Sequence, residues 1–239
     1  MNSINKTIEL YKKEDIDKST FIKDMYASHH TKLYEYAEYL HKTDIEKITI
    51  ENNRVITTSR KHGIKIECNS GDYRIAPIEV LNFFDYEKDE SNMIESLICF
   101  GSKKKNFFDI GANIGWYSIM VAKSNRNVLV HSFEPIPKTY QSLVKNVDLN
   151  SLSNISTHNF GFSDKSGEFD FYYYPEGSGN ASSANVTGRS DTEVVKCKVK
   201  TLDEYINESN EQIDFIKCDV EGAELLVFKG GMDAIKNSK

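Results

Sequence analysis

Glycines and an acid with the spacing of a ligand-binding turn lie near the middle of the chain. The segment Asp109-Ile-Gly111-Ala-Asn113-Ile-Gly115 follows the apolar run NFF and precedes a helical pattern, WYSIMVAKS. Glycine permits positive φ angles and lets a ligand approach the backbone without a Cβ in the way. A helix beginning near Gly115 offers unpaired N–H groups and a partial positive charge, which suit a carboxylate. We therefore predict that residues 108–115 hold a cofactor.

Two further acids follow the next apolar runs. Glu134 directly follows VLVHSF, and Asp164 comes shortly after ISTHNFGF. A carboxylate at Glu134 can accept hydrogen bonds from two vicinal ribose hydroxyls. Asp164 is placed to accept a hydrogen bond from an amine such as that of adenine. Asp109 suits an ammonium group. The third glycine of the dinucleotide motif G-x-G-x-x-G is absent, which disfavours NAD and FAD. The three acids together predict S-adenosylmethionine, a cofactor with an amine, a ribose and an adenine.

Each of these residues also has a purely structural interpretation. The glycines can simply form a tight turn between a strand and a helix. Glu134 can be a surface carboxylate before a proline, and Asp164 can belong to a local turn, where aspartate is common.

The candidate catalytic residues are Asp219 and Glu221, which follow the run IDFIKCD. Methyl transfer from S-adenosylmethionine to a protic acceptor needs alignment and a base that takes the proton. Either carboxylate can be that base or can orient the cofactor, and Glu221 can equally cap the helix that follows Gly222. None of the histidines stands out as a base. A metal-assisted reaction is an alternative, because several carboxylates converge here, but no carboxylate/histidine ligand set is visible, so we expect no metal.

The elements that must position these residues alternate between strand and helix from residue 106 onward. Apolar runs at 106–110, 128–133 and 155–162 are separated by helical patterns, and a fourth run ends at Asp219. This alternation predicts an α/β fold with a mostly parallel sheet covered on both faces. Ligands bind such a sheet at the carboxyl ends of its strands, where all of the candidate residues lie.

The alternation is interrupted by two segments with antiparallel character, EFDFYYYP and VVKCKVK, and a Gly/Ser/Asn-rich loop separates them. We predict that this loop, from about Ser178 to Asp191, is mobile and borders the acceptor pocket, an ordinary solvent loop being the alternative. Thr201 and Glu204 form a capping box at the start of a short helix.

The first part of the chain has a different character. Leu33, Tyr36, Ala37 and Leu40 form one apolar stripe of a polar helix, residues 47–68 predict a small antiparallel meander, and Met93, Ile94, Leu97 and Ile98 fall on one helical face. We therefore expect residues 1–76 to form an N-terminal extension and residues 77–239 to form the cofactor-binding domain.

Several motifs, in order and spacing, resemble the FkbM-type methyltransferases: FFDIGANIGWYS, HSFEP, NFGFSDKSGEF, VKTLDEYI and IDFIKCDVEGAELLVFKGG. The similarity runs from about Pro77 to Gly231. The resemblance implies a Rossmann-like class I fold and methyl transfer to an oxygen, often of a carbohydrate, a lipid or another small molecule. A class I sheet normally has seven strands, and three of them are missing here, so we expect a truncated chain that self-associates through an open sheet edge.

Composition narrows the class of protein further. The net charge of −6 argues against a nucleic-acid partner. No signal peptide or uncharged apolar stretch of membrane-spanning length is visible, and four scattered cysteines suit a reducing compartment, so we expect a cytoplasmic location. Two alternatives to a methyltransferase remain open: a non-catalytic module that binds an adenosyl ligand, and an NAD-dependent oxidoreductase, which the missing glycine disfavours.

Overall fold

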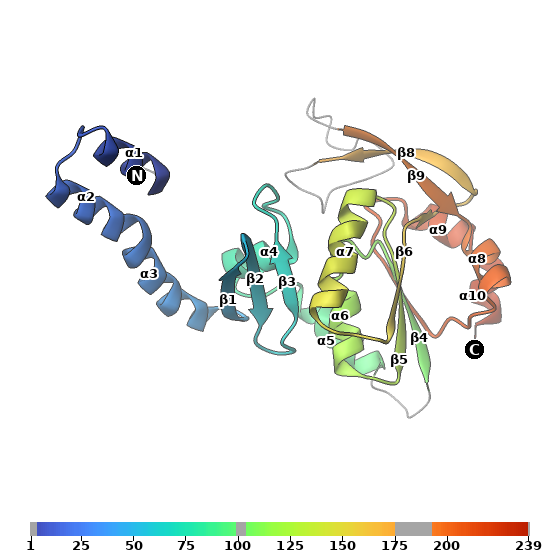
Figure 1. Ribbon diagram of the computed structural model, residues 1–239. Helices are drawn as coiled ribbons and strands as arrows, with labels where there is room; N and C mark the ends of the chain where they lie inside the picture. The colour runs from blue at the N-terminus through green and yellow to red at the C-terminus, as the bar shows by residue number, and fades with distance from the viewer. Residues whose placement is uncertain (1–3, 99–103, 175–192, 239) are drawn as a thin grey trace.

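A four-stranded parallel sheet forms the centre of the molecule. The computed structural model describes residues 4–98, 104–174 and 193–238. The sheet has the order β10-β4-β5-β6 (Figure 1), with β4 at Lys105–Ile110, β5 at Val128–Phe133, β6 at Ile155–His158 and β10 at Phe215–Cys218. Every neighbouring pair is parallel, so the carboxyl ends of the strands meet at one edge.

Hydrophobic side chains cover both faces of this sheet. Phe107 packs into a core with α6 (Trp116–Ser124) and α7 (Pro137–Leu149). Its neighbour Phe108 faces a second core with α8 (Leu202–Ser209), α9 (Glu224–Lys229) and α10 (Met232–Asn237). Successive strand residues point to opposite faces, so a continuous apolar run is what a doubly covered sheet requires. The predicted α/β class I architecture is confirmed.

A second, three-stranded sheet has the order β7-β9-β8, with β7 at Gly161–Phe162, β8 at Gly167–Tyr173 and β9 at Glu193–Lys200. Strands β8 and β9 are antiparallel, as predicted. The expectation of one continuous strand over 155–162 was wrong, because the chain leaves the parallel sheet after His158 and β7 pairs with β9 instead. The side-chain amide of Asn159 donates to the carbonyls of Glu134 and Pro135, which fixes this crossover.

The predicted meander is confirmed as β1 (Ile45–Glu51), β2 (Arg54–Ser59) and β3 (Lys65–Cys68). Its free edge lies against α7: Asn150 Oδ1 accepts from Lys65 N at 2.9 Å, and Asn146 Oδ1 accepts from Glu67 N at 3.0 Å. Ile45 and Ile66 share a core with α4 (Ala76–Phe83) and α5 (Lys88–Ile98). The meander therefore does not cover β10, whose outer edge pairs with no strand in the described part of the chain.

Helices α1 (Ile4–Lys12), α2 (Lys18–Met25) and α3 (Thr31–Tyr39) extend away from the rest of the molecule (Figure 1). A π-helical turn, Tyr26–His30, joins α2 to α3, and a short 3-10 turn, Leu40–Lys42, follows α3. The predicted stripe on α3 is helical, but Leu33 and Tyr36 are exposed because nothing in the described chain packs over them. The four residues predicted on one helical face lie on α5, where Ile94 and Ile98 are buried and Met93 and Leu97 are exposed.

Across the described residues, none of the helices combines the length and the apolar character needed to cross a membrane.

Candidate functional site

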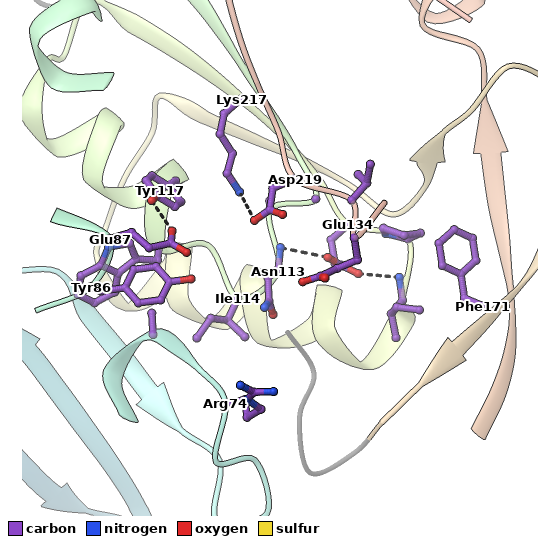
Figure 2. A pocket seen from close by; sticks show the side chains of 18 residues that line it. Arg74, Tyr86, Glu87, Asn113, Ile114, Tyr117, Glu134, Phe171, Lys217 and Asp219 are labelled. Atoms are coloured by element: carbon purple, nitrogen blue, oxygen red, sulfur yellow. Dashed lines mark hydrogen bonds and ion pairs between the residues drawn. The ribbon is translucent and has the colours of Figure 1, made fainter. Parts of the chain in front are cut away.

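A cavity of about 220 Å³ opens at the carboxyl ends of β4, β5 and β10 (Figure 2). Of the predicted site residues, five line it: Gly111, Asn113, Glu134, Asp219 and Glu221. Because these residues follow three different strands, only the parallel order of the sheet brings them together. Gly115, Asp109 and Asp164 lie around this cavity without lining it.

Gly111 makes the close approach of two strand ends possible. Its φ is +81°, and a Cβ built on it would lie 1.9 Å from the carbonyl oxygen of Asp219. The N–H groups of Gly111 and Ala112 both donate to the carbonyl of Phe133, at 3.1 and 3.0 Å. The glycine is therefore required by the packing of β4 against the turn after β10, whatever ligand the cavity receives.

Gly115 occupies the residue before α6 with a φ of +94°. A Cβ there would lie 2.6 Å from Cδ1 of Leu143, so helix α7 packs directly over this turn. Helix α6 thus begins at the cavity, and the first N–H groups of a helix have no partner within it.

Glu134 is the most strongly fixed acid of the site. Its side chain is buried, Oε2 accepts from the N–H of Asn113 at 3.0 Å, and Oε1 accepts from the N–H of Ile136 at 2.9 Å. Burial raises its pKa to about 7, although both backbone hydrogen bonds act to lower it. Each oxygen keeps a second lone pair, so the carboxylate can accept further hydrogen bonds.

Asn113 has a φ of +48°, and its N–H donates to Glu134. Its side-chain oxygen is buried and has no hydrogen-bond partner among the described residues. An unpaired buried acceptor carries a free-energy cost that a bound donor would remove. This atom therefore favours a ligand that brings an N–H or O–H group to the cavity.

Asp109 is fully buried beneath the glycine turn. Its Oδ2 accepts from the Ser118 hydroxyl at 2.5 Å, and its Oδ1 lies 3.8 Å from Nζ of Lys217, which pairs with it across the sheet. Burial is the main cause that raises the pKa of Asp109, and Lys217 opposes it. With 0% exposure, this carboxylate has no surface for a direct ligand contact.

Lys217 connects the buried acid to the cavity. Its Nζ lies 3.2 Å from Oδ2 of Asp219 and 4.8 Å from the centre of the Tyr117 ring. The neighbouring carboxylates raise the pKa of Lys217 despite its burial, so it stays protonated. The sequence carried a signal for this residue, because a lysine lies inside an otherwise apolar strand, but we did not predict its role.

Asp219 and Glu221 differ in their surroundings, although both are exposed to the cavity. Asp219 is held by Lys217, whereas Glu221 has a φ of +52° in a tight turn. Burial, Asp219 and Glu224 raise the pKa of Glu221. Among the described residues no side chain caps α9, whose N-cap residue is Ala223; instead, Oε1 of Glu224 accepts from the N–H groups of Val220 and Gly222 in the turn before the helix, both at 3.1 Å.

Asp164 borders an adjoining cavity of about 110 Å³. This second cavity is mostly apolar, with Ile110, Phe162 and Leu226 among its walls, and it shares Gly111 with the first. The side chain of Asp164 is exposed and lies 3.4 Å from the Ser163 hydroxyl. The predicted loop from Ser178 to Asp191 lies outside the described residues.

Residues that precede the cofactor turn form the remaining wall, and sequence reasoning missed them. Arg74, Tyr86 and Glu87 line the cavity. The hydroxyl of Tyr117 lies 2.5 Å from Oε2 of Glu87 and 3.0 Å from Oε2 of Glu90 (Figure 2 shows the first contact). Glu87 has a φ of +42°, so the loop before α5 is bent to present it. Neither periodicity nor a motif marks these positions.

The fold and the cavity define an α/β protein with a cavity at the strand ends of a parallel sheet. The family model of the methyltransferase FkbM domain matches residues 109–239, which is over half of the chain. The chain therefore belongs to the FkbM methyltransferase family.

Two curated relatives illustrate the similarity. Hexuronic acid methyltransferase AglP of Haloferax volcanii is 32% identical over 153 residues, which cover 62% of this chain and 59% of the relative. Methyltransferase 1 of Beauveria bassiana is 25% identical over 140 residues, which cover 51% of this chain and 56% of the relative. The chain thus matches somewhat over half the length of each.

Solved structures show a more distant similarity. Pyrococcus horikoshii TYW2 in complex with MeSAdo has a TM-score of 0.34 at 20% identity, covering 55% of this chain and 49% of that one. The METTL16 MTase domain has a TM-score of 0.33 at 19% identity, covering 52% of each chain. The fold assignment rests on the sheet topology and the family match.

Proposed function

We propose that this chain binds S-adenosylmethionine and transfers its methyl group to a hydroxyl of a carbohydrate, a lipid or another small molecule. The observation that carries the proposal is Glu134, a buried carboxylate that two backbone N–H groups aim into the cavity beside the glycine turn. In this position its free lone pairs can accept both ribose hydroxyls.

The other contacts of the cofactor follow from the groups that the cavity leaves unpaired. The first N–H groups of α6 would hold the carboxylate, and the side-chain oxygen of Asn113 would accept from the ammonium or a hydroxyl. The apolar cavity beside Asp164 would receive the adenine. The carboxylate of Asp164 can accept a hydrogen bond from the adenine amine. Asp109 would act indirectly, by fixing Lys217 and Ser118.

When bound, the cofactor supplies an electrophilic methyl group on a sulfonium. The chain must then align the acceptor oxygen and remove its proton. Asp219 is our first candidate for the base, because it is exposed to the cavity and Lys217 fixes its orientation. Glu221, two residues later on the same turn, is the second candidate.

One relative supports a carbohydrate acceptor, since AglP is named a hexuronic acid methyltransferase. The chain matches only 59% of that protein, so the acceptor belongs to the proposal. A cytoplasmic location, the absence of a nucleic-acid partner and self-association through the edge of β10 likewise stay predictions.

Titration calorimetry with S-adenosylmethionine and S-adenosylhomocysteine tests binding, and formation of S-adenosylhomocysteine with a panel of sugars, lipids and alcohols tests transfer. Asp219→Asn should lower turnover while cofactor affinity is kept, and Asp170→Asn, on the exposed face of β8, is the matched control. Turnover that survives in Asp219→Asn but is lost in Glu221→Gln would make Glu221 the base. Absence of cofactor binding by the wild-type chain would refute the proposal.

A further inference from the structure

The cavity carries two cations among its lining residues, and they differ in their partners. Lys217 is enclosed by the carboxylates of Asp219 and Asp109 and by the Tyr117 ring. Arg74 makes no ion pair and no side-chain hydrogen bond within the part of the chain that the structure describes. The ammonium group of Lys217 is therefore occupied by contacts within the chain, whereas the N–H groups of the Arg74 guanidinium can donate to a ligand.

The backbone of Arg74 is held in place even though its side chain is exposed. Its N–H donates to Oδ1 of Asp72 at 3.0 Å, and the Asp72 side chain is buried. The next residues, Ile75 and Ala76, are buried where α4 begins. An anchored backbone on both sides restricts where the guanidinium can reach, which lowers the entropy cost of binding.

The position of Arg74 separates it from the predicted cofactor contacts. In Figure 2 it lies across the cavity from Lys217 and Asp219, on the wall built by residues before the glycine turn. Glu221 is the acid of the cavity on which Arg74 acts electrostatically, and the pKa of Glu221 is nevertheless raised, because burial, Asp219 and Glu224 outweigh the arginine.

We propose that Arg74 binds a carboxylate group of the methyl acceptor, so that the chain selects acidic acceptors such as sugar acids. This inference rests on the proposed function. The planar guanidinium matches a carboxylate with two parallel hydrogen bonds, which a lysine cannot reproduce. The carboxylate of S-adenosylmethionine is already assigned to the first N–H groups of α6, which lie on the other side of the glycine turn. Arg74 precedes the family-matched region, so it can differ between chains that share the same cofactor site.

The test compares two probes that differ at one carbon: glucuronate, which carries a carboxylate, and glucose, which carries a hydroxymethyl group. Binding is measured by saturation-transfer NMR and calorimetry, with and without S-adenosylhomocysteine. We expect glucuronate to bind the wild-type chain about tenfold tighter than glucose. Arg74→Gln should abolish this preference, and Arg74→Lys should retain only part of it.

Arg126→Gln is the matched control, because Arg126 is an exposed arginine on the turn between α6 and β5. It should leave the preference unchanged, and thermal melting should show that all variants fold. Equal or undetectable binding of both probes, or a preference that survives in Arg74→Gln, would overturn the inference. So would a loss of S-adenosylhomocysteine affinity of about tenfold in Arg74→Gln, because that would assign Arg74 to the cofactor. If the wild-type chain fails to bind S-adenosylhomocysteine, the proposed function fails, and the probe comparison without it still decides the role of Arg74.

Discussion

The two walls of the cavity are built in different ways. One wall follows the strands of the parallel sheet and contains Gly111, Asn113 and Glu134, all fixed by backbone hydrogen bonds or close packing. The other wall comes from residues before the glycine turn and contains Arg74 and Glu87, which are exposed. The first wall is part of the fold itself, whereas the second is attached to it.

This difference separates two tasks. A contact that depends on the end of a parallel strand cannot change without disturbing the sheet, so it suits a cofactor that never changes. A contact from an attached loop can change freely, so it suits the acceptor. The comparison predicts that substitutions in the first wall act on stability and cofactor affinity, and that substitutions in the second wall act on the acceptor.

The largest effect is expected for Gly111→Ala. The new Cβ would meet the carbonyl oxygen of Asp219 at 1.9 Å, and the φ of +81° is strained for any side chain. We expect a loss of several kcal/mol in the free energy of unfolding, measured with urea, and loss of S-adenosylmethionine binding. Gly63→Ala is the control, since Gly63 has a φ of +59° with nothing within 4 Å, and it should cost only about 1–2 kcal/mol. Equal losses in the two variants would show that the close approach of the strands is unimportant.

Glu134→Ala should weaken S-adenosylmethionine binding by about 1.5–3 kcal/mol, which is the scale of hydrogen bonds to a charged group. Calorimetry measures this change, and Glu168→Ala, at an exposed position of β8, is the control. An unchanged affinity would show that Glu134 does not bind the ribose hydroxyls.

Cofactor affinity should also depend on pH. The pKa of Glu134 is raised to about 7, so the carboxylate is protonated below that pH and ionised above it. Since the ionised form accepts the ribose hydrogen bonds, affinity should fall as the pH drops from 8 to 6, by about tenfold. Glu134→Gln should remove the dependence. Constant wild-type affinity over this range would contradict the assignment.

The smallest effect is expected for Tyr117→Phe, a change on α6 that removes its contacts with Glu87 of the second wall. The variant loses the contacts of the hydroxyl with Glu87 and Glu90 but keeps the ring under Lys217. We expect about 1 kcal/mol less stability and less than about a threefold change in S-adenosylmethionine affinity. Tyr140→Phe on α7 is the control, because its hydroxyl contacts Thr157. A tenfold loss of cofactor affinity would place the contacts of Tyr117 with Glu87 and Glu90 in the cofactor site.

The contrast between the walls also explains how much the sequence predicts. Alternating strands and helices define the sheet, and the strand-end rule then brings Gly111, Glu134 and Asp219 together. The same reasoning missed Arg74 and Glu87, because tertiary packing of the loops before residue 109 places them. It also missed the exit of the chain from the sheet after His158 and the exposure of Leu33, since local patterns do not reveal which neighbour a strand or helix meets.

The central claim is that the strand-end wall is an S-adenosylmethionine site. Its most direct test is titration calorimetry of S-adenosylmethionine into the wild-type chain and into Glu134→Ala at pH 8, with NAD as the competing ligand. We predict one site on the wild-type chain, an affinity lower by about 1.5–3 kcal/mol in the variant, and no binding of NAD. Binding of NAD in place of S-adenosylmethionine, or equal S-adenosylmethionine affinity of the two proteins, would contradict the account.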